Sequence, residues 1–238
     1  MPARCFLVRH GQTDWNLEQR IQGQSDLPLN AAGLRQAEEL AGYFASRPLT
    51  ALYASHLQRS RQTAEAIARE TGLEIMVDPD LAEIYLGEWE GLTAQEVDGR
   101  YQGAYRLWQS SPSQVRIPGA EPLTRFRIRA RAAFSRIVDR HPDGRVAIVT
   151  HGGVIASLLS DSLDADYDAL LRRLSLDNAG VSAVEHAVRP PQILWINETG
   201  HLGPSREPSA GLTHLIMAGA SGLGTERPVA REVRSGRR

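Results

Sequence analysis

Short, continuous apolar runs recur along the chain, and longer segments with apolar residues at helical spacing separate them. Strand-length runs lie at residues 5–8, 51–54, 75–77 and 146–149, and two more, rich in β-branched residues, lie near 180–188 and 192–196. Strands that are apolar on both sides are typical of a sheet that helices cover on both faces. The pattern therefore predicts a three-layer α/β/α sandwich around a mainly parallel sheet.

Helical periodicity fills the segments between these runs. Asn30 suits the N-cap of a helix whose apolar residues recur from Leu34 to Phe44. A second helix is expected after Leu57, with Gly72 just beyond its end. The longest helical pattern covers residues 121–141, and a further one covers 154–163. Strands and helices thus alternate, as a parallel sheet requires.

The segment of about 84–120 departs from this alternation. Its periodicity is weak, and it carries five aromatic residues, namely Tyr85, Trp89, Tyr101, Tyr105 and Trp108. We interpret it as a small cap inserted over a site, with aromatics suited to an apolar or sugar-like ligand. We expect one domain over residues 1–203, cap included. Residues 204–238 are rich in Gly, Ser, Pro and Arg and are expected to be largely disordered.

Composition narrows the chemistry and the partners. A formal net charge of -1 over 238 residues provides no field that would attract nucleic acid or an anionic membrane surface. No apolar stretch reaches the length of a membrane span, so neither nucleic acid nor membrane is an expected partner. Because the first predicted strand begins within a few residues of Met1, we expect no signal peptide and a cytoplasmic protein.

The residue types that are absent exclude several mechanisms. Lysine does not occur, so all 27 basic residues are arginines, which excludes Schiff-base chemistry and the lysine of a phosphate-binding loop. Cys5 is the single cysteine, which excludes an intramolecular disulfide and a cysteine metal cluster. An anion would have to be held by arginines, histidines and backbone N–H groups.

Two of the predicted strands are each followed by a His-Gly pair. His10 comes after the run at 5–8 and directly follows Arg9, and His151 comes after the run at 146–149. In a parallel sheet both histidines emerge at one edge, and Arg59, at the start of the helix after the second strand, reaches the same edge. Two guanidiniums and two imidazoles make a positive pocket that suits a dianionic phosphoryl group.

Phosphoryl transfer in such a pocket needs a nucleophile and a proton donor. A neutral histidine can attack phosphorus through a ring nitrogen, while the other, protonated, donates to a phosphoryl oxygen. A leaving alkoxide takes its proton from a carboxyl whose pKa the neighbouring phosphate charge raises. Glu83, shortly after the third strand, is the best-placed carboxyl, and Glu88 and Glu90 compete for the role.

Five motifs in order resemble the histidine phosphatase superfamily, which has the phosphoglycerate-mutase-like fold. They are LVRHGQTDWN, QGQSDLPLN, SHLQRSRQTA, LAEIYLGEWEG and VTHGGVI, and the similarity covers roughly residues 4–202. The resemblance implies that His10 is phosphorylated during turnover and that Glu83 is the proton donor. It further implies that Arg9, Arg59 and His151 hold the phosphoryl group.

The same motifs supply the predicted substrate-binding set. Asn16, Gln22 and Gly23 match the loop that lines the family's phosphate pocket, and Gly11, Thr13 and Gly152 complete the set. Members use no metal for this step, so neither a metal nor another cofactor is expected. Dimers are common among members, and a homodimer is compatible with the resemblance.

Other phosphoryl chemistries lack the residues they need. A cysteine phosphatase requires an arginine six positions after its cysteine, but Gly11 follows Cys5 at that spacing. Asp78 follows a strand as an aspartate phosphatase requires, yet the chain has no lysine partner for it. No HExxH-type metal spacing occurs.

Within the family, the cap distinguishes two reactions. Cofactor-dependent mutases carry an arginine pair in this insert, whereas Arg100, Arg106 and Arg116 stand singly here. Residues 196–202 also resemble the end of the small phosphatase branch. The predicted function is a metal-independent phosphatase acting on small phosphomonoesters. Phosphoglycerate mutase is the alternative, followed by a phosphate-binding regulatory protein without activity.

Overall fold

A computed structural model of the protein describes residues 3–186 and 191–205. The C-terminal tail was expected to be disordered, and its residues from 206 onward lie outside the described part of the chain.

One six-stranded sheet forms the centre of the protein. Its strands are β1 (Arg4–Arg9), β2 (Ala51–Ala54), β3 (Ile75–Val77), β4 (Arg145–Thr150), β5 (Val181–Glu185) and β6 (Gln192–Glu198). They lie in the order β3-β2-β4-β1-β5-β6. The first four are parallel to one another, whereas β5 is antiparallel to β1 and β6 is antiparallel to β5. All six predicted strands are present, but apolar runs alone did not reveal the antiparallel edge.

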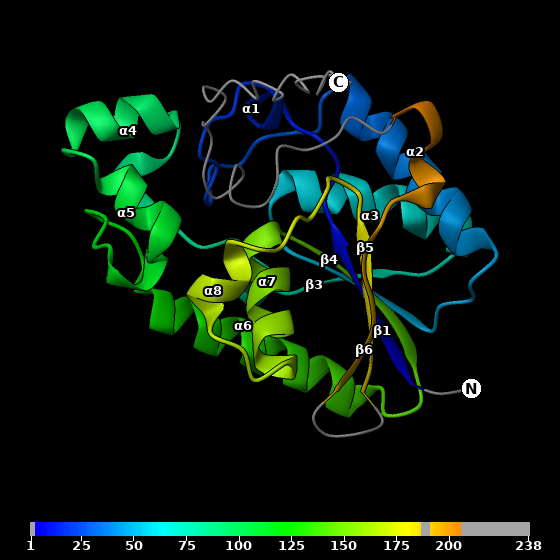
Figure 1. Ribbon diagram of the computed structural model, residues 1–238. Coiled ribbons are helices and arrows are strands. Elements are labelled where there is room, and N and C mark those ends of the chain that lie inside the picture. The colour runs from blue at the N-terminus through cyan, green and yellow to red at the C-terminus, as the bar shows by residue number, and fades with distance from the viewer. Residues whose placement is uncertain (1–2, 187–190, 206–238) are drawn as a thin grey trace, which may run out of the picture.

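Helices cover both faces of the sheet, which confirms the predicted three-layer fold (Figure 1). One layer contains α2 (Ala31–Ala45) and α3 (Gln58–Thr71). The other contains α6 (Leu123–Arg140), α7 (Gly152–Ser162) and α8 (Tyr167–Leu171).

Successive residues of β1 pack against opposite layers. Phe6 lies in the apolar cluster of α2 and α3, whereas Leu7 lies in the cluster that contains Phe126 and Ile155. Burial of such a side chain is worth about 1.5–3 kcal/mol. The apolar pattern of the strands therefore directly reflects burial on both sides.

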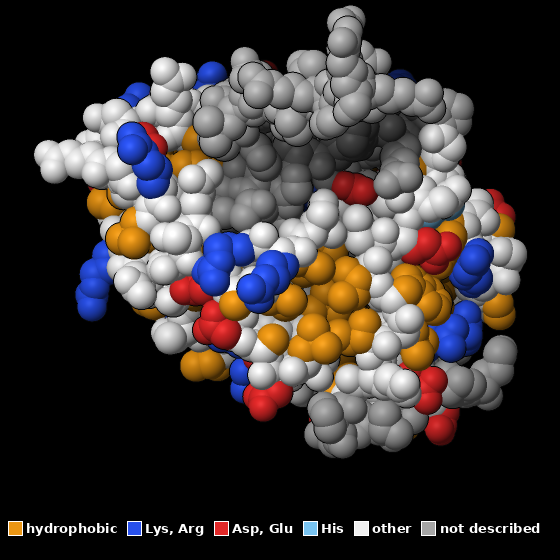
Figure 2. Space-filling model, in the orientation of Figure 1, with side chains coloured by type: hydrophobic (Ala, Val, Ile, Leu, Met, Phe, Trp, Pro, Cys, Tyr) orange, Lys and Arg blue, Asp and Glu red, His pale blue; other side chains and the backbone are white. Residues whose placement is uncertain are grey.

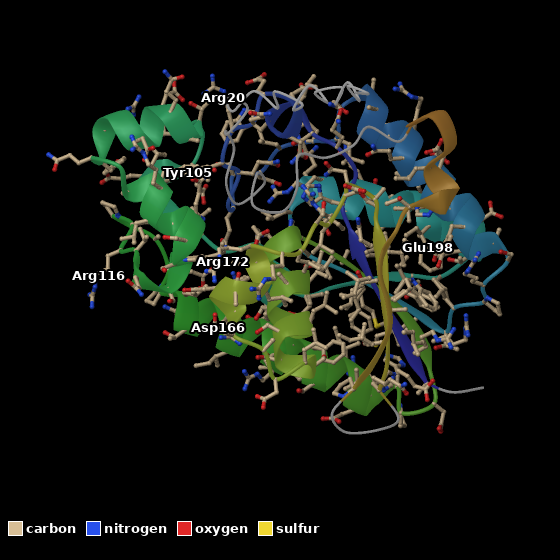
Figure 3. The ribbon with its side chains drawn as sticks, in the orientation of Figure 1. Arg20, Tyr105, Arg116, Asp166, Arg172 and Glu198 are labelled. Atoms are coloured by element: carbon tan, nitrogen blue, oxygen red, sulfur yellow. The ribbon has the colours of Figure 1, made fainter. Side chains whose placement is uncertain are left out.

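The cap is built of short helices. They are the 3-10 turn η2 (Gly87–Trp89), α4 (Ala94–Arg100), α5 (Ala104–Ser110) and the 3-10 turn η3 (Pro112–Gln114). Trp89 packs against Tyr101, Tyr105 and Trp108, with ring centroids 5.7–6.4 Å apart. Figure 3 shows Tyr105 inside this unit. These aromatics pack against one another and belong to the same apolar cluster as Leu7 and Phe126, so the cap shares the core of the main domain.

Three further short elements complete the described chain: α1 (Asp14–Leu17), the 3-10 turn η1 (Pro79–Leu81) and the 3-10 segment η4 (Gly200–Ser205). No helix within residues 3–186 and 191–205 is both long and apolar enough to cross a membrane. Figure 2 shows acidic and basic side chains interspersed around a central group of apolar ones on the face in view. The surface in view therefore carries no field of a single sign.

Candidate active site

The two histidines lie side by side at the carboxyl ends of β1 and β4. These strands pair in parallel with Arg9 opposite Thr150, and the His10 N–H donates to the Thr150 carbonyl over 3.0 Å. The imidazole centroids of His10 and His151 are 5.2 Å apart. The two residues are only 4% and 0% exposed. The sheet register therefore brings together two groups that lie 141 positions apart in the sequence.

His10 is held in a single tautomer. Its Nδ1 lies 2.7 Å from the Gly11 carbonyl, and because a carbonyl can only accept, Nδ1 carries the proton and Nε2 keeps its lone pair. Burial, reinforced by the Arg59 and Arg9 charges, lowers the pKa of His10 well below its ordinary value. The side chain is therefore a neutral imidazole with a free nucleophilic nitrogen.

His151 occupies a different local setting. It is the N-cap residue of α7, and neither ring nitrogen has a hydrogen-bond partner among the described residues. Burial, followed by the Arg59 charge, lowers the pKa of His151 well below its ordinary value. With these neighbours alone the imidazole is neutral, so the protonated state expected from the sequence requires the charge of a bound dianion.

Two buried arginines supply the positive charge of the site. Arg59 donates through its Nη atoms to the carbonyls of Gly23 (2.7 Å) and Ser25 (2.8 Å). Arg9 donates through Nη1 to the Leu176 carbonyl over 2.5 Å. Burial lowers the pKa of each guanidinium to about 10. Both remain charged at neutral pH, and the Nε of each has no partner among the described residues.

Glu83 approaches the same cavity from the segment after β3. Its Oε2 accepts from the Gly153 N–H and its Oε1 from the Ile84 N–H, each over 2.9 Å. Burial raises the pKa of Glu83 above its ordinary value, although these two hydrogen bonds oppose the shift. The direction agrees with the sequence expectation, and burial is its largest cause among the protein's own groups.

The structure separates the three candidate carboxyls. Glu90 accepts from the Gln24 N–H and the Ser25 hydroxyl, each over 2.8 Å, so it ties the 22–25 loop to the cap. Glu88 is exposed and accepts from the Tyr101 hydroxyl. Of the three, only Glu83 lines the cavity.

Most of the predicted site residues meet at this cavity. Its lining consists of Arg9, His10, Asn16, Gln22, Gly23, Arg59, Glu83, Ile84, Leu86 and Gly152. Ile84 and Leu86 were not predicted, although their position beside Glu83 was a usable signal. The predicted residues outside this lining are His151, which lies next to His10, together with Gly11 and Thr13.

Gly11 and Thr13 do not line the cavity but contact residues next to it. The Gly11 N–H donates to the Thr63 hydroxyl, and a Cβ at Gly11 would collide with the Gly33 carbonyl of α2. Thr13 caps α1, and its N–H and hydroxyl bind Asn16 Oδ1 over 3.0 and 3.1 Å. Thr13 therefore orients Asn16, whose Nδ2 has no partner among the described residues.

Sequence reasoning missed two supporting residues. A Cβ at Gly153 would collide with the Glu83 carboxylate, so this glycine allows the acid to reach the start of α7. Asn178 donates through Nδ2 to the His10 carbonyl over 3.1 Å and to Asn16 Oδ1 over 3.2 Å. The second glycine of His151-Gly152-Gly153 was a visible signal, whereas nothing local distinguishes Asn178.

Within the described part of the chain, no group of three or more His, Cys, Asp or Glu side chains is arranged to hold a metal ion.

The chain belongs to the histidine phosphatase superfamily (branch 1), whose family model matches residues 5–199. A curated relative is "Phosphoglycerate mutase-like protein 4" of Arabidopsis thaliana, 42% identical over 159 residues, which are 66% of this chain and 69% of the relative. A bifunctional protein of Mycobacterium tuberculosis is 37% identical over 203 residues, or 84% of this chain. The match spans only about half (55%) of that longer relative.

Solved structures show the same fold. A mycobacterial glucosyl-3-phosphoglycerate phosphatase complexed with VO3 superimposes with a TM-score of 0.75 at 30% identity, covering 83% of this chain and 100% of that one. The superfamily contains both phosphatases and phosphoglycerate mutase-like proteins, so membership defines phosphoryl chemistry and leaves the reaction open.

Proposed function

We propose that the protein is a metal-independent phosphatase that hydrolyses small phosphomonoesters through a phosphohistidine on His10. One observation carries the proposal: buried polar atoms without partners among the described residues surround a neutral imidazole. They are Arg9 Nε, Arg59 Nε, Asn16 Nδ2 and the ring nitrogens of His151. A buried group left unpaired costs about 1–3 kcal/mol, and a phosphoryl group offers several oxygens that such donors can bind.

In the first half-reaction, the Nε2 lone pair of His10 attacks phosphorus and the P–O bond to the leaving group breaks. Arg9, Arg59 and Asn16 bind the phosphoryl oxygens, and their donors neutralise the charge on them. Protonated Glu83 transfers its proton to the departing oxygen, so the product leaves as a neutral alcohol.

In the second half-reaction, the Glu83 carboxylate takes a proton from water as that water attacks phosphorus. The P–N bond then breaks, inorganic phosphate forms, and His10 Nε2 regains its lone pair. Because burial raises the pKa of Glu83 above its ordinary value, the carboxyl holds a proton more readily than an exposed glutamate, which suits it to begin the cycle as an acid.

The cavity favours a phosphatase over a mutase. A phosphoglycerate carboxylate would need an additional cation, but Arg9 and Arg59 are the only arginines among the described lining residues. Arg116 is exposed and lines a neighbouring pocket instead of this cavity (Figure 3), and Arg106 pairs with Asp98 over 3.3 Å. The apolar residues next to Glu83 are Ile84 and Leu86, so we propose that they, rather than the cap's buried aromatics, contact the leaving group.

A metal-free screen tests the function. Wild-type protein in excess EDTA should release inorganic phosphate from a panel of alkyl, sugar and aryl phosphates. It should also retain an acid-labile, base-stable phosphoryl label on His10. Interconversion of 2- and 3-phosphoglycerate with negligible phosphate release would establish the mutase instead. Phosphate binding without turnover of any ester would establish the regulatory alternative.

The expected partners and location stay predictions. Cell fractionation tests the cytoplasmic location, and binding assays with DNA, RNA and anionic vesicles test the expected lack of such partners. Light scattering on the full chain tests the homodimer.

A further inference from the structure

Arg129, on the second turn of α6, contacts the segment that carries Glu83 at several points. Its Nη1 donates to the carbonyls of Asp80 (2.9 Å) and Ala82 (2.6 Å), and its Nη2 donates to the Glu83 carbonyl (2.8 Å). One guanidinium thus satisfies three backbone carbonyls within four residues of chain. A charge-assisted donor of this kind holds a carbonyl more strongly than a neutral donor does.

Glu121 completes the arrangement from the end of the cap. Its Oε1 and Oε2 accept from Arg129 Nη2 (2.5 Å) and Nε (3.1 Å), which makes a bidentate pair. Its Oε1 also accepts from the Tyr85 N–H over 2.9 Å, and its own N–H donates to the Tyr85 carbonyl over 3.0 Å. The pair therefore binds the main chain on both sides of Glu83.

All five N–H groups of Arg129 are used in these contacts, so the guanidinium has one orientation. The side chains of Arg129 and Glu121 are only 16% and 12% exposed, which limits screening by solvent. Neither residue lines the cavity. Their contacts with the site run through the backbone that presents the Glu83 carboxyl to Gly153 and the substrate.

We propose that Arg129, oriented by Glu121, is the positioning residue for the general acid Glu83. The role rests on the proposed phosphatase function. Without the guanidinium, the 80–85 segment keeps the hydrogen bonds that Thr150 and Gln24 donate to its carbonyls but loses those to Asp80 and Ala82. The carboxyl should then shift away from the leaving oxygen. The Arg129 charge also acts to lower the pKa of Glu83, so its removal should raise that pKa further.

Leaving-group dependence distinguishes a displaced acid from general damage. An alkyl phosphate needs protonation of its leaving oxygen, whereas a nitrophenyl phosphate leaves as a stable phenolate and needs little. Arg129→Met should lower kcat/KM, which reports the steps up to phosphoenzyme formation, by about 10²-fold for an alkyl phosphate and by less than about tenfold for a nitrophenyl phosphate. Glu83→Gln should show the same selectivity, and the double variant should add little to either single loss.

Arg131→Met is the matched control. Arg131 lies two positions along α6 and makes a bidentate pair with Asp161 over 2.8 and 2.9 Å, at 59% exposure. It loses a similar ion pair without touching the 80–85 segment, and both substrates should be turned over at wild-type rates. Vanadate affinity should be unchanged in Arg129→Met, because the phosphate donors are intact. Should that variant not fold, Glu121→Gln tests the same selectivity.

The outcomes distinguish failure of the positioning role of Arg129 from failure of the proposed phosphatase mechanism. If Glu83→Gln is slow on alkyl phosphates but Arg129→Met and Glu121→Gln are not, the positioning role is wrong and the phosphatase function stands. Equal losses on both substrates together with weakened vanadate binding would also overturn the positioning role, in favour of general support of the fold. If Glu83→Gln itself leaves alkyl phosphate hydrolysis unchanged, the proposed mechanism fails and the role of Arg129 fails with it.

Discussion

The ends of β1 and β4 are near copies of each other, yet they place their histidines in different hydrogen-bonding environments. Each is an apolar strand that ends on a buried histidine followed by glycine. After His10 the chain continues without regular structure as far as α1, and the Gly11 carbonyl accepts from Nδ1. After His151 the chain enters α7 at once, and both ring nitrogens lack a partner in the described chain.

This difference explains how one sheet edge provides two roles. A histidine whose Nδ1–H is occupied presents a defined lone pair at Nε2, which a nucleophile needs. A histidine with two unoccupied nitrogens can gain a proton when an anion arrives, which a phosphoryl-binding group needs. The backbone immediately after each strand, irregular in one case and a helix start in the other, is therefore what would distinguish the proposed nucleophile from the proposed binding group.

We expect the largest loss of activity from a substitution of His10, at the end of β1. His10→Ala should reduce turnover by about 10⁴-fold or more, because no other group replaces the nucleophile. The acid-labile phosphoryl label should disappear as well. Single-turnover assays with labelled substrate measure both losses, and His56→Ala, at an exposed histidine, serves as the control. Turnover that survives in His10→Ala would show that the β1 histidine is not the nucleophile.

A smaller loss is expected at the β4 end. His151→Asn should lower kcat by about 10²–10³-fold, the effect of losing one donor to a developing charge. The phosphohistidine should still form, slowly, because His10 keeps its tautomer. Rapid-quench measurement of the labelled intermediate checks this. Complete absence of label in His151→Asn would mean that the nucleophile has been assigned to the wrong histidine.

Gly153→Ala tests whether the start of α7 also positions the acid. The added Cβ collides with the Glu83 carboxylate, so we expect a loss of about 10²-fold on alkyl phosphates, typical of a removed general acid. Steady-state kinetics on alkyl and nitrophenyl phosphates measure it. Gly42→Ala on α2, where a Cβ has open space, is the control and should leave kcat unchanged. A fully active Gly153→Ala protein would contradict the close approach of Glu83 to α7.

The smallest effect concerns stability against pH. The pKa values of both histidines are lowered in the folded protein, so the unfolded chain binds more protons below its histidine pKa of about 6.5. Stability is therefore fully present above that pH and falls as the pH decreases, by about 1.4 kcal/mol per pH unit for each imidazole.

His151→Asn should remove one of these contributions and flatten the acid side of the curve. Denaturant melts between pH 8 and pH 5, with wild type and variant compared at each pH, measure the difference. The raised pKa of Glu83 acts in the opposite sense, since its stability contribution is lost as the pH rises, but it is common to both proteins and cancels. Parallel curves would show that His151 is not neutral in the folded state.

Much of the architecture could be predicted because burial imposes a pattern of apolar residues that is visible over short stretches of the sequence. Strands covered on both sides must be apolar throughout, and helices with one buried face must repeat at helical spacing. The predicted capping by Asn30 is present, with its side chain accepting from the Gly33 N–H over 2.9 Å. The helices α4 and α5 of the cap are only seven residues each, which is too short for helical periodicity to stand out in the sequence.

The sequence by itself determined the class of the fold, and it predicted the residues of the site: His10, His151, Arg9, Arg59 and Glu83. Only the tertiary structure decided that Glu83, and not Glu88 or Glu90, lines the cavity. It also placed Gly153 and Asn178 against site residues and Arg129 against the segment that carries Glu83. The physical reason is that strand and helix propensities act over a few residues, whereas a proton's position and a carboxyl's pKa depend on groups brought together by sheet register and burial.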